Sequence, residues 1–491
     1  MEPIIMADFL MYLRSDAGET LQAQLRAQLV SAILDGQLVA GERLPSSRAL
    51  ARRLGVGRNT VTIACQRLLE EGYLDAQQRR GLYVTAEPAN LRARANPQLS
   101  DHKDRIAWQR RFVARPSAMR NIDKPRDWRR YPYPFIYGQR DQALFPIRAW
   151  RDCTRQSLAL SAVEAWSGDE VDTDDAMLVE QIRRRILPRR GVWARSDEVL
   201  ITVGAQQALD LIARLLLGPA KAVGIENPCY VDARNIFALS GASIRPIPVD
   251  QHGLVVDRRL ARCDLAYVTP SHQSPTTVTM PMERRLRLLE MARRHDVIVI
   301  EDDYESEANY LDNPMPALKS IDSTGRVLYV GSLSKLLAPG LRLGFLVGPA
   351  ELIAEARALR RLAVRHPAAN NQRAAALFLA GGHADALVRR LHEVYRRRWQ
   401  AMGAALHRHL PESTVPPTFG GSSFWVAGPA GLDADDLATR AGQSGIIIEP
   451  GAVHFHGRRP PRRFFRLAFS AIPVERIEAG IRKLAELIHG S

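Results

Sequence analysis

The sequence predicts two folded parts, a small winged helix-turn-helix at the N-terminus and a larger α/β domain with a mainly parallel sheet. Within residues 18–87, two helical apolar patterns flank a glycine-containing turn, and a basic hairpin follows them. Over 132–490, short apolar strands alternate with helical patterns, which favours a layered α/β domain. With 491 residues, 46% of them hydrophobic, the chain is too long for one compact core. A basic linker is expected over 88–131.

The charge of the chain favours an acidic partner. Its formal net charge is +15, and twelve of its Lys and Arg residues fall within 88–131, beside only four Asp. Excess positive charge attracts nucleic acid whatever the fold. The basic segment is either a solvated linker or a further DNA contact, and the sequence leaves both interpretations open.

Cysteine usage and hydropathy exclude several classes of protein. The four cysteines, Cys65, Cys153, Cys229 and Cys263, are far apart and show no CxxC or Cys/His spacing, which argues against a disulfide framework or a zinc site. No apolar run approaches the roughly 20 residues that span a bilayer. The N-terminus lacks the cationic region and cleavage site of a secretion signal. We therefore expect a cytoplasmic protein without membrane contact.

The N-terminal pattern begins with an amphipathic helix predicted over 20–35, after which Gly36 acts as a stop. A helix start at Pro45-Ser46-Ser47 and a Gly55-Val56-Gly57 turn then lead into a helix from about Arg58 to Glu71. Two helices joined by a short glycine-containing turn form a helix-turn-helix. The stretch YLDAQQRRGLYVT that follows predicts two short strands around a basic turn, which is a wing.

The predicted DNA-binding helix carries candidate contacts to bases and phosphates, Arg58, Asn59, Thr60 and Thr62. Amide, hydroxyl and guanidinium groups near a helix N-terminus suit base edges and phosphates in a major groove. Ser46 and Arg48 are candidates for a phosphate contact at the preceding helix start. Arg79 and Arg80, at the wing tip, are candidates for a backbone or minor-groove contact. Any one of these arginines alone is more often a solvated surface charge, so the prediction rests on the set.

The segment LVAGERLPSSRALARRLGVGRNTVTIACQRLLEEGYLDAQQRRGLYV, residues 38–84, closely resembles the GntR-type winged helix. The resemblance extends over nearly all of 20–87. It implies sequence-specific binding of operator DNA.

The larger part alternates strands and helices. VLITVG (199–204) leads into the helical pattern AQQALDLIARLLL (205–217). The other apolar strands are AVGIE (222–226), LAYV (265–268), VIVIE (297–301), VLYVG (327–331) and LGFLVG (343–348). Strands that are apolar on both faces and separated by helices predict a mainly parallel sheet. The C-terminal region, which ends in the strand FFRLAFS and a helix, predicts a smaller α+β part.

Lys335 is the candidate cofactor-binding lysine. The chain holds only six lysines, and this one lies between two apolar strands, with Ser332 and Arg342 close in sequence. A P-loop lysine would follow GxxxxGK[ST], which is absent here. Pyridoxal 5′-phosphate (PLP) needs an amine for its aldehyde and donors for its phosphate, so a Schiff-base lysine beside a phosphate-binding loop fits better.

The stretch VIVIEDDYESE supplies the acidic partner that PLP requires, since an anion opposite the pyridine nitrogen keeps the ring protonated. Asp302, at the end of the strand, is the candidate for this role, and Tyr304 is the candidate for the 3′-oxygen of the ring. A metal site made of Glu301, Asp302 and Asp303 is the competing interpretation. Because adjacent strand residues alternate faces and no His accompanies them, we predict no metal.

The phosphate of PLP is expected at the helix that follows strand 199–204, where Gly204, Ala205 and Gln206 offer backbone N–H groups. Tyr230, in ENPCY, is a candidate to stack on the ring. An ordinary half-buried tyrosine explains that position equally well.

Taken together, these residues resemble fold type I aminotransferases, and the order of the two parts resembles the MocR/GabR family of regulators. The match runs from about Phe135 to Ile488, and its specific pieces include ENPCYVDAR, VTPSHQSPTTVTMP, EDDYESE and SLSKLLAPGLRLG. The resemblance implies the roles given above to the Schiff-base lysine, the carboxylate and the tyrosine. Ser332 and Arg342 would serve the phosphate, although Arg342 could instead reach a bound effector. Arg466 would bind an effector carboxylate through a bidentate pair.

Two departures from the aminotransferase pattern bear on function, and the first of them weakens the case for an efficient transaminase. Where aminotransferases have Asn-Pro-Thr-Gly, this chain has Ser274-Pro275-Thr276-Thr277, so the Asn that bonds the ring oxygen is missing. The usual Tyr-Gly-Asp-Pro-x-Gly segment reads WSGDEVDTDDAM at 166–177. The contacts that this loop normally makes in the pocket are put in doubt.

We therefore predict a PLP-dependent, DNA-binding transcription regulator that responds to an amino-acid-like effector. In this hypothesis the amine of the effector displaces Lys335 from PLP and forms an external aldimine. This aldimine favours a conformation in which the aminotransferase-like domain is closed differently. The resemblance implies a homodimer, which suits paired DNA half-sites. Two alternatives are kept: an aminotransferase with a DNA-binding appendage, and a regulator that uses the pocket without PLP.

Overall fold

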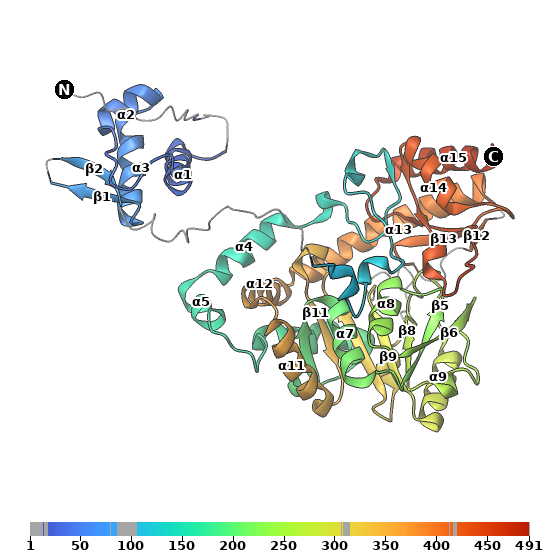
Figure 1. Ribbon diagram of the computed structural model, residues 1–491. Helices are drawn as coiled ribbons and strands as arrows, with labels where there is room; N and C mark the ends of the chain where they lie inside the picture. Colours follow the sequence, from blue (N-terminus) through green and yellow to red (C-terminus); the bar gives the residue numbers. More distant parts are fainter. Residues whose placement is uncertain are drawn as a thin grey trace. The chain divides into compact units, whose positions relative to one another are not determined.

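The computed structural model describes residues 13, 18–78, 80–85, 106–305, 307, 315–411, 413–415 and 420–490. The chain divides into two units, Met1–Arg111 and Phe112–Ser491 (Figure 1). Of the segment expected as a basic linker, 88–105 lies outside the described residues. The rest is shared between the units, with 106–111 in the first and 112–131 in the second.

The first unit is a helix-turn-helix followed by an antiparallel hairpin. Its elements are α1 (Leu21–Leu34), α2 (Ser47–Leu54), α3 (Arg58–Glu70), β1 (Leu74–Gln77) and β2 (Gly81–Val84). Apolar residues of the three helices, among them Leu25, Leu50 and Leu68, are buried in one core. Gly55 ends α2 in the left-handed conformation, with φ 66°, and lets the chain turn into α3. The predicted winged helix-turn-helix is confirmed.

The second unit is built on an eight-stranded sheet with the order β4-β11-β10-β9-β8-β5-β6-β7. Its strands are β4 (Val199–Thr202), β5 (Ala222–Asn227), β6 (Ser243–Asp250), β7 (Gly253–Leu254), β8 (Leu265–Val268), β9 (Ile298–Asp303), β10 (Val327–Ser332) and β11 (Gly344–Val347). The pairs from β10 through β9, β8 and β5 to β6 are parallel, whereas β11 is antiparallel to both of its neighbours. The prediction of a mainly parallel sheet is confirmed.

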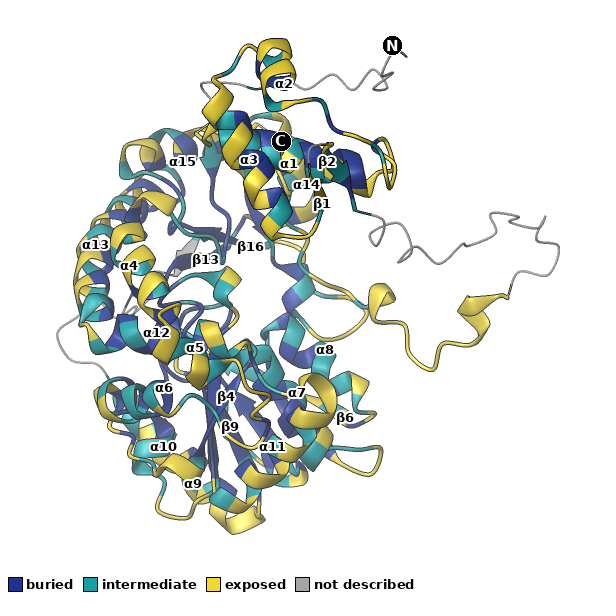
Figure 2. Cartoon of the chain, turned by 90° about the vertical axis from the view of Figure 1, so that its left-hand side faces the viewer, coloured by how far each residue is buried: buried dark blue, intermediate teal, exposed yellow. Residues whose placement is uncertain are grey.

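Helices cover both faces of this sheet, and Figure 2 shows its buried strands between partly exposed helices. One face packs against α7 (Gly204–Leu216), α8 (Val231–Leu239) and α11 (Ala350–Val364). The other face packs against α9 (Met282–His295). Successive residues of β10 alternate between these cores, since Leu328 belongs to the first and Val327 to the second.

A smaller antiparallel sheet lies in the C-terminal part of the unit, in the order β12-β13-β16-β15. Its strands are β12 (Thr414–Val415), β13 (Ser423–Ala427), β15 (Glu449–Pro450) and β16 (Phe464–Ala468). The remaining α-helices and strands are β3 (Tyr133–Pro134), α4 (Ile147–Ser157), α5 (Leu160–Trp166), α6 (Ala176–Gln181), α10 (Leu318–Ile321), α12 (Ala369–Ala380), α13 (His383–His409), α14 (Ala434–Gln443), β14 (Ile446–Ile447) and α15 (Val474–His489). In the part of the chain that the structure describes, no helix has the length and apolar character needed to cross a membrane.

The parallel strands place their carboxyl ends at one edge of the large sheet. There β9 ends in Asp302 and Asp303, β10 ends in Ser332, and β4 leads almost directly into the N-terminus of α7. Ligands of open α/β sheets bind at this edge. The fold therefore places Asp302, Ser332 and the start of α7, which were predicted as parts of the site from the sequence, at the same edge of the sheet.

Candidate functional site

A cavity of about 550 Å³ lies at this edge of the sheet. It brings together the sequence-predicted residues Ala205, Gln206, Tyr230, Asp302, Tyr304, Ser332, Lys335, Arg342 and Arg466. The last predicted cofactor residue, Gly204, begins α7 and lies against the guanidinium of Arg342. Residues that are distant in the sequence thus line the same cavity.

Lys335 is half-buried in the cavity wall, after the end of β10. Its Nζ lies 4.3 Å from the centroid of the Tyr137 ring. Burial lowers the pKa of Lys335 to about 8; Glu305 opposes this shift, whereas Lys124 and Arg466 add to it. Compared with an ordinary lysine, much more of this side chain is neutral and nucleophilic near neutral pH.

The three consecutive carboxylates at the end of β9 face different partners. Glu301 accepts hydrogen bonds from two backbone N–H groups of α10. Asp303 accepts hydrogen bonds from Arg190 and Tyr329, at 2.7 and 2.8 Å. Asp302 lines the cavity. The three side chains therefore do not converge on a metal ion.

Asp302 has one satisfied and one orphaned oxygen. Its Oδ2 accepts a hydrogen bond from Tyr267 OH at 2.8 Å, whereas its buried Oδ1 has no hydrogen-bond partner among the described residues. Burial raises the pKa of Asp302 to about 7, and the hydrogen bond from Tyr267 works against that rise. A cationic N–H at Oδ1 would satisfy this oxygen and keep the carboxylate ionised. Tyr267 was not predicted as a site residue, although a tyrosine in the apolar strand LAYV is a signal for such a role.

The N-terminus of α7 and Arg342 lie together at one corner of the cavity. Arg342 Nη2 donates to Val203 O and Gln206 Oε1, both at 3.3 Å. Gly204 has a φ of +75°, and a Cβ at this position would lie only 2.8 Å from Arg342 Nη2. Glycine therefore lets the guanidinium approach the backbone. The first N–H groups of a helix lack intrahelical acceptors and attract anions.

Tyr230 lines the same cavity and is fixed by hydrogen bonds. Its OH donates to Asp232 Oδ2 at 2.9 Å and accepts from Gln206 Nε2 at 3.3 Å. Gln206 Nε2 also donates to Asp232 at 2.5 Å. Asp232, which sequence analysis did not assign, thus ties the tyrosine to the start of α7.

Arg466 is only 2% exposed, on β16. Its guanidinium stacks on Tyr137, 3.6 Å from the ring centroid, and forms an ion pair with Glu449. Burial alone would raise the pKa of Glu449, but Arg466 and His454 outweigh it and hold this pKa at about 2. Arg466 Nε has no hydrogen-bond partner within the described ranges. Neither Tyr137 nor Glu449 was predicted as a site residue.

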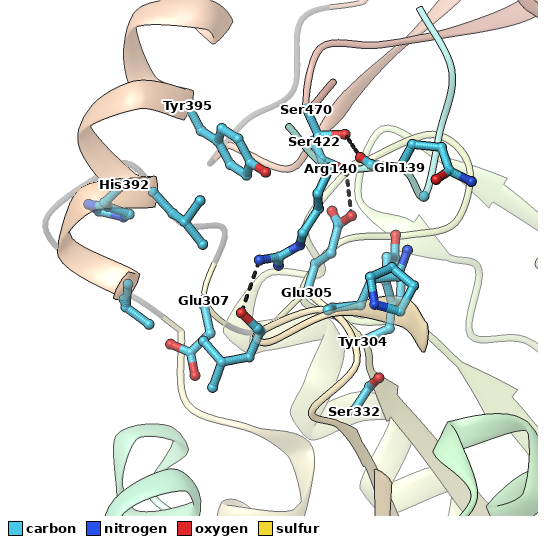
Figure 3. A pocket seen from close by; sticks show the side chains of 16 residues that line it. Gln139, Arg140, Tyr304, Glu305, Glu307, Ser332, His392, Tyr395, Ser422 and Ser470 are labelled. Carbon is cyan, nitrogen blue, oxygen red and sulfur yellow. Dashed lines mark hydrogen bonds between the residues drawn. The ribbon is translucent and has the colours of Figure 1, made fainter. Parts of the chain in front are cut away.

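A second, smaller cavity of about 60 Å³ shares Tyr304, Ser332 and Lys335 with the first. Figure 3 shows Glu305 in its wall, where this carboxylate accepts hydrogen bonds from Ser422 and, at 3.2 Å, from Tyr137 OH. Lys335 therefore borders two cavities.

Of the two segments that depart from the aminotransferase pattern, one lines the large cavity and the other does not. Ser274, which stands where aminotransferases have Asn, lines the large cavity. The altered segment 166–177 contributes no lining residue among those described. Its Asp174 instead accepts hydrogen bonds from Arg357 and Arg360, at 2.7 and 2.6 Å, in a buried cluster.

In the first unit, α3 presents its candidate DNA contacts on an exposed surface. Arg58, Asn59 and Thr62 are exposed and Thr60 is half-buried. Thr62 Oγ1 donates to Arg58 O at 3.0 Å, so this hydroxyl is engaged by its own helix. The opposite face of α3, which includes Val61 and Leu68, packs into the core.

The other candidate DNA contacts lie around α3. Ser46 Oγ caps α2 by accepting a hydrogen bond from Ala49 N at 3.3 Å. Arg48 and Arg80 are exposed. Arg79 lies outside the described residues.

Comparison with known proteins identifies both parts. Residues 21–84 match the family model "Bacterial regulatory proteins, gntR family", and residues 173–484 match "Aminotransferase class I and II". The HTH-type transcriptional regulator TauR of Rhodobacter capsulatus is 45% identical over 469 residues, which are 96% of each chain. This chain is a GntR-type transcriptional regulator of the MocR type, with an aminotransferase-like domain. The probable rhizopine catabolism regulatory protein MocR of Rhizobium meliloti is 31% identical, over 97% of this regulator and 95% of its own length.

Solved aminotransferases share the fold of the larger part. LysN, an α-aminoadipate aminotransferase from Thermus thermophilus complexed with N-(5′-phosphopyridoxyl)-L-leucine, superposes with a TM-score of 0.71 at 28% identity, covering 78% of the regulator and 99% of LysN. Kynurenine aminotransferase of Pyrococcus horikoshii, in complex with PMP, gives 0.70 at 29% identity, with coverages of 78% and 98%. The predicted fold type I aminotransferase-like domain is confirmed. Because the regulators match nearly the whole chain and these enzymes only part of it, a regulator is favoured over an aminotransferase with an appendage.

Proposed function

We propose that this regulator holds PLP on Lys335, binds operator DNA through its helix-turn-helix and wing, and changes its DNA affinity when an amine effector enters the cavity. The observation that carries the proposal is Asp302 Oδ1, which is buried without a hydrogen-bond partner among the described residues. It belongs to the cavity in which burial lowers the pKa of Lys335 to about 8.

The polar groups of the cavity fit those of PLP. Asp302 would face the ring nitrogen and Tyr304 the 3′-oxygen. Arg342, the Ser332 hydroxyl and the backbone N–H groups at the start of α7 would bind the phosphate. Bound PLP supplies an aldehyde that condenses reversibly with primary amines. Tyr267 holds Asp302 in place, and the lowered pKa of Lys335 lets its amine exchange protons near neutral pH.

The effector that we propose is an amino-acid-like molecule, with a primary amine and a carboxylate. Arg466 lines the cavity, and its Nε, which has no hydrogen-bond partner among the described residues, is available for such a carboxylate. If the effector binds one conformation of the domain more tightly than another, it shifts the population toward that conformation. The difference between the two binding affinities sets the size of the shift.

We propose that the regulator acts as a homodimer on paired half-sites. Large apolar side chains are exposed on two successive helices, with Ile147 54% exposed on α4 and Leu160 79% exposed on α5. A dimer interface that includes α4 and α5 would cover these side chains.

Asn59→Ala is expected to weaken operator binding by about 1–3 kcal/mol, because an exposed amide near the start of α3 is suited to pair with adenine. Binding to unrelated DNA should change little. Gln37→Ala, which removes an exposed amide outside α3, is the matched control. Fluorescence anisotropy with operator and scrambled DNA at one salt concentration measures both. Equal losses on the two DNAs would contradict a role of Asn59 in base recognition.

Tyr267→Phe is expected to weaken PLP binding about tenfold, because it removes a hydrogen bond to a buried carboxylate. The same bond lowers the pKa of Asp302, so its loss raises that pKa further above about 7 and keeps the carboxyl neutral to higher pH. The defect should therefore be larger at pH 6.5 than at pH 9. Absorbance titration with PLP measures it, with Tyr131→Phe, outside the cavity lining, as control. A pH-independent defect would contradict the role given to Asp302.

The proposed function is tested by mobility shift and footprinting on the intergenic DNA beside the gene, with apo protein, with PLP, and with PLP plus a panel of amino acids. We expect a defined footprint whose affinity or extent changes with PLP and with at least one amino acid. A footprint that none of them alters would leave a DNA-binding protein without the proposed sensing role.

A further inference from the structure

A second lysine, Lys124, lies in the wall of the large cavity. Its Nζ donates to Tyr137 O at 2.8 Å. A Cβ added to Gly138 would lie 3.3 Å from this Nζ and 3.7 Å from Lys335 Nζ, so both amines approach the same glycine. Lys124 therefore faces the space next to the proposed Schiff-base lysine.

Three cations surround one aromatic ring in this wall. The guanidinium carbon of Arg466 lies 3.6 Å, Lys335 Nζ 4.3 Å and Lys124 Nζ 5.6 Å from the centroid of Tyr137. Glu449 neutralises Arg466. Glu305 accepts a hydrogen bond from Tyr137 OH on the Lys335 side of the ring. Within the described ranges, no carboxylate lies within ion-pair distance of Lys124, so this ammonium has no carboxylate partner in the wall.

Both Lys124 and Arg466 retain donors for a ligand. A lysine ammonium has three N–H donors, and the hydrogen bond to Tyr137 O uses one of them. Arg466 Nε, on a side chain only 2% exposed, has no hydrogen-bond partner among the described residues. A buried, unsatisfied cationic donor favours an anionic ligand.

We propose that Lys124 and Arg466 together bind the acidic group of the effector, and that Lys124 makes the regulator selective for amines that carry such a group. This proposal rests on the proposed function, since the amine of the same molecule would occupy the Lys335 side of the cavity. The Arg342 corner, at the start of α7, is left for the phosphate.

The position of Lys124 in the chain gives this contact a second consequence. It belongs to the segment 112–131, which begins the second unit directly after the first unit ends. The segment is held by Arg120, whose Nη2 donates to Ala452 O at 2.7 Å and whose carbonyl accepts from Asn235 Nδ2 at 3.0 Å. An acidic group bound at Lys124 adds a restraint to the stretch of chain that continues into the DNA-binding unit.

The test measures the change in the PLP absorbance band of holo protein on titration with paired ligands. Glycine, β-alanine and 4-aminobutanoate are compared with ethylamine, propylamine and butylamine, in which a methyl group replaces the carboxylate. We expect wild type to prefer at least one amino acid to its paired amine. Lys124→Met should reduce that preference about tenfold, because a charge-assisted hydrogen bond to the carboxylate is lost, whereas any effect on the shared amine group acts on both members of a pair. Lys124→Arg should retain most of it.

Lys483→Met, which removes an exposed lysine outside the cavity, is the matched control. The same proteins are assayed for operator affinity with and without the preferred amino acid. Measured relative to its own affinity without effector, Lys124→Met should lose the response at concentrations that saturate wild type. An unchanged preference in Lys124→Met overturns this inference alone. Wild type that binds paired ligands equally overturns it together with the acidic effector of the proposed function. Wild type that takes up no PLP overturns it together with the proposed function.

Discussion

Lys335→Ala protein incubated with PLP is expected to show no absorbance band that borohydride fixes to the chain. Lys335 Nζ is the amine that lies in the cavity wall with its pKa lowered to about 8, and alanine leaves no nitrogen there to bond the cofactor. Wild type should instead gain one phosphopyridoxyl group after reduction. Absorbance and intact-protein mass, before and after borohydride and desalting, measure the difference.

Lys483→Met serves as control for the loss of a lysine remote from the cavity lining. It should retain the band and the added mass. A Lys335→Ala protein that still acquires the group would assign the covalent bond to another amine, and Lys124 would then be the first to examine, because it shares the cavity.

Glu449→Ala is expected to lower the free energy of unfolding by about 3–5 kcal/mol, because it leaves the buried guanidinium of Arg466 without its carboxylate. Glu449→Gln should cost less, since the amide oxygen can still accept a hydrogen bond. Urea denaturation of the apo protein measures both, and Glu355→Ala, on the exposed face of α11, controls for loss of surface charge. If Glu449→Ala lowers the free energy of unfolding no more than Glu355→Ala does, the buried ion pair does not stabilise the fold as described.

The ion pair also predicts how stability depends on pH. The folded-state pKa of Glu449, about 2, lies below its ordinary value of 4.5. Its contribution is therefore fully present above about pH 4.5 and declines as the pH falls toward 2. The difference in stability between wild type and Glu449→Gln should shrink over this interval.

Local patterns in the sequence predicted the fold well. The alternation of apolar strands and helices predicted the large sheet, and the turn at Gly55-Val56-Gly57 predicted the helix-turn-helix. These features depend on residues that are neighbours in the chain. The antiparallel placement of β11 between β4 and β10 was not predicted, because strand order depends on contacts between distant segments.

The candidate site was predicted only in part, for the same reason. Lys335 and Asp302 stand out because a rare lysine and a carboxylate at the end of an apolar strand are visible in the sequence. Glu449 and Tyr137 acquire their roles only when β15 and β16 pair and bring Arg466 over the tyrosine ring. Lys124 was open to the argument used for Lys335, since it too is one of only six lysines. It was not predicted as a site residue because it lies in the segment that was expected to be a linker.

The measurement that bears most directly on the proposed function is the operator affinity of apo and PLP-loaded wild type, compared with Lys335→Ala under the same two conditions. Anisotropy at one fixed salt concentration gives all four values. We expect PLP, or PLP with an amino acid that the cavity binds, to change the affinity of wild type by about 5- to 150-fold, and to leave Lys335→Ala unchanged. Equal affinities of wild type in every state, or an equal response of the variant, would contradict a regulator that senses through Lys335.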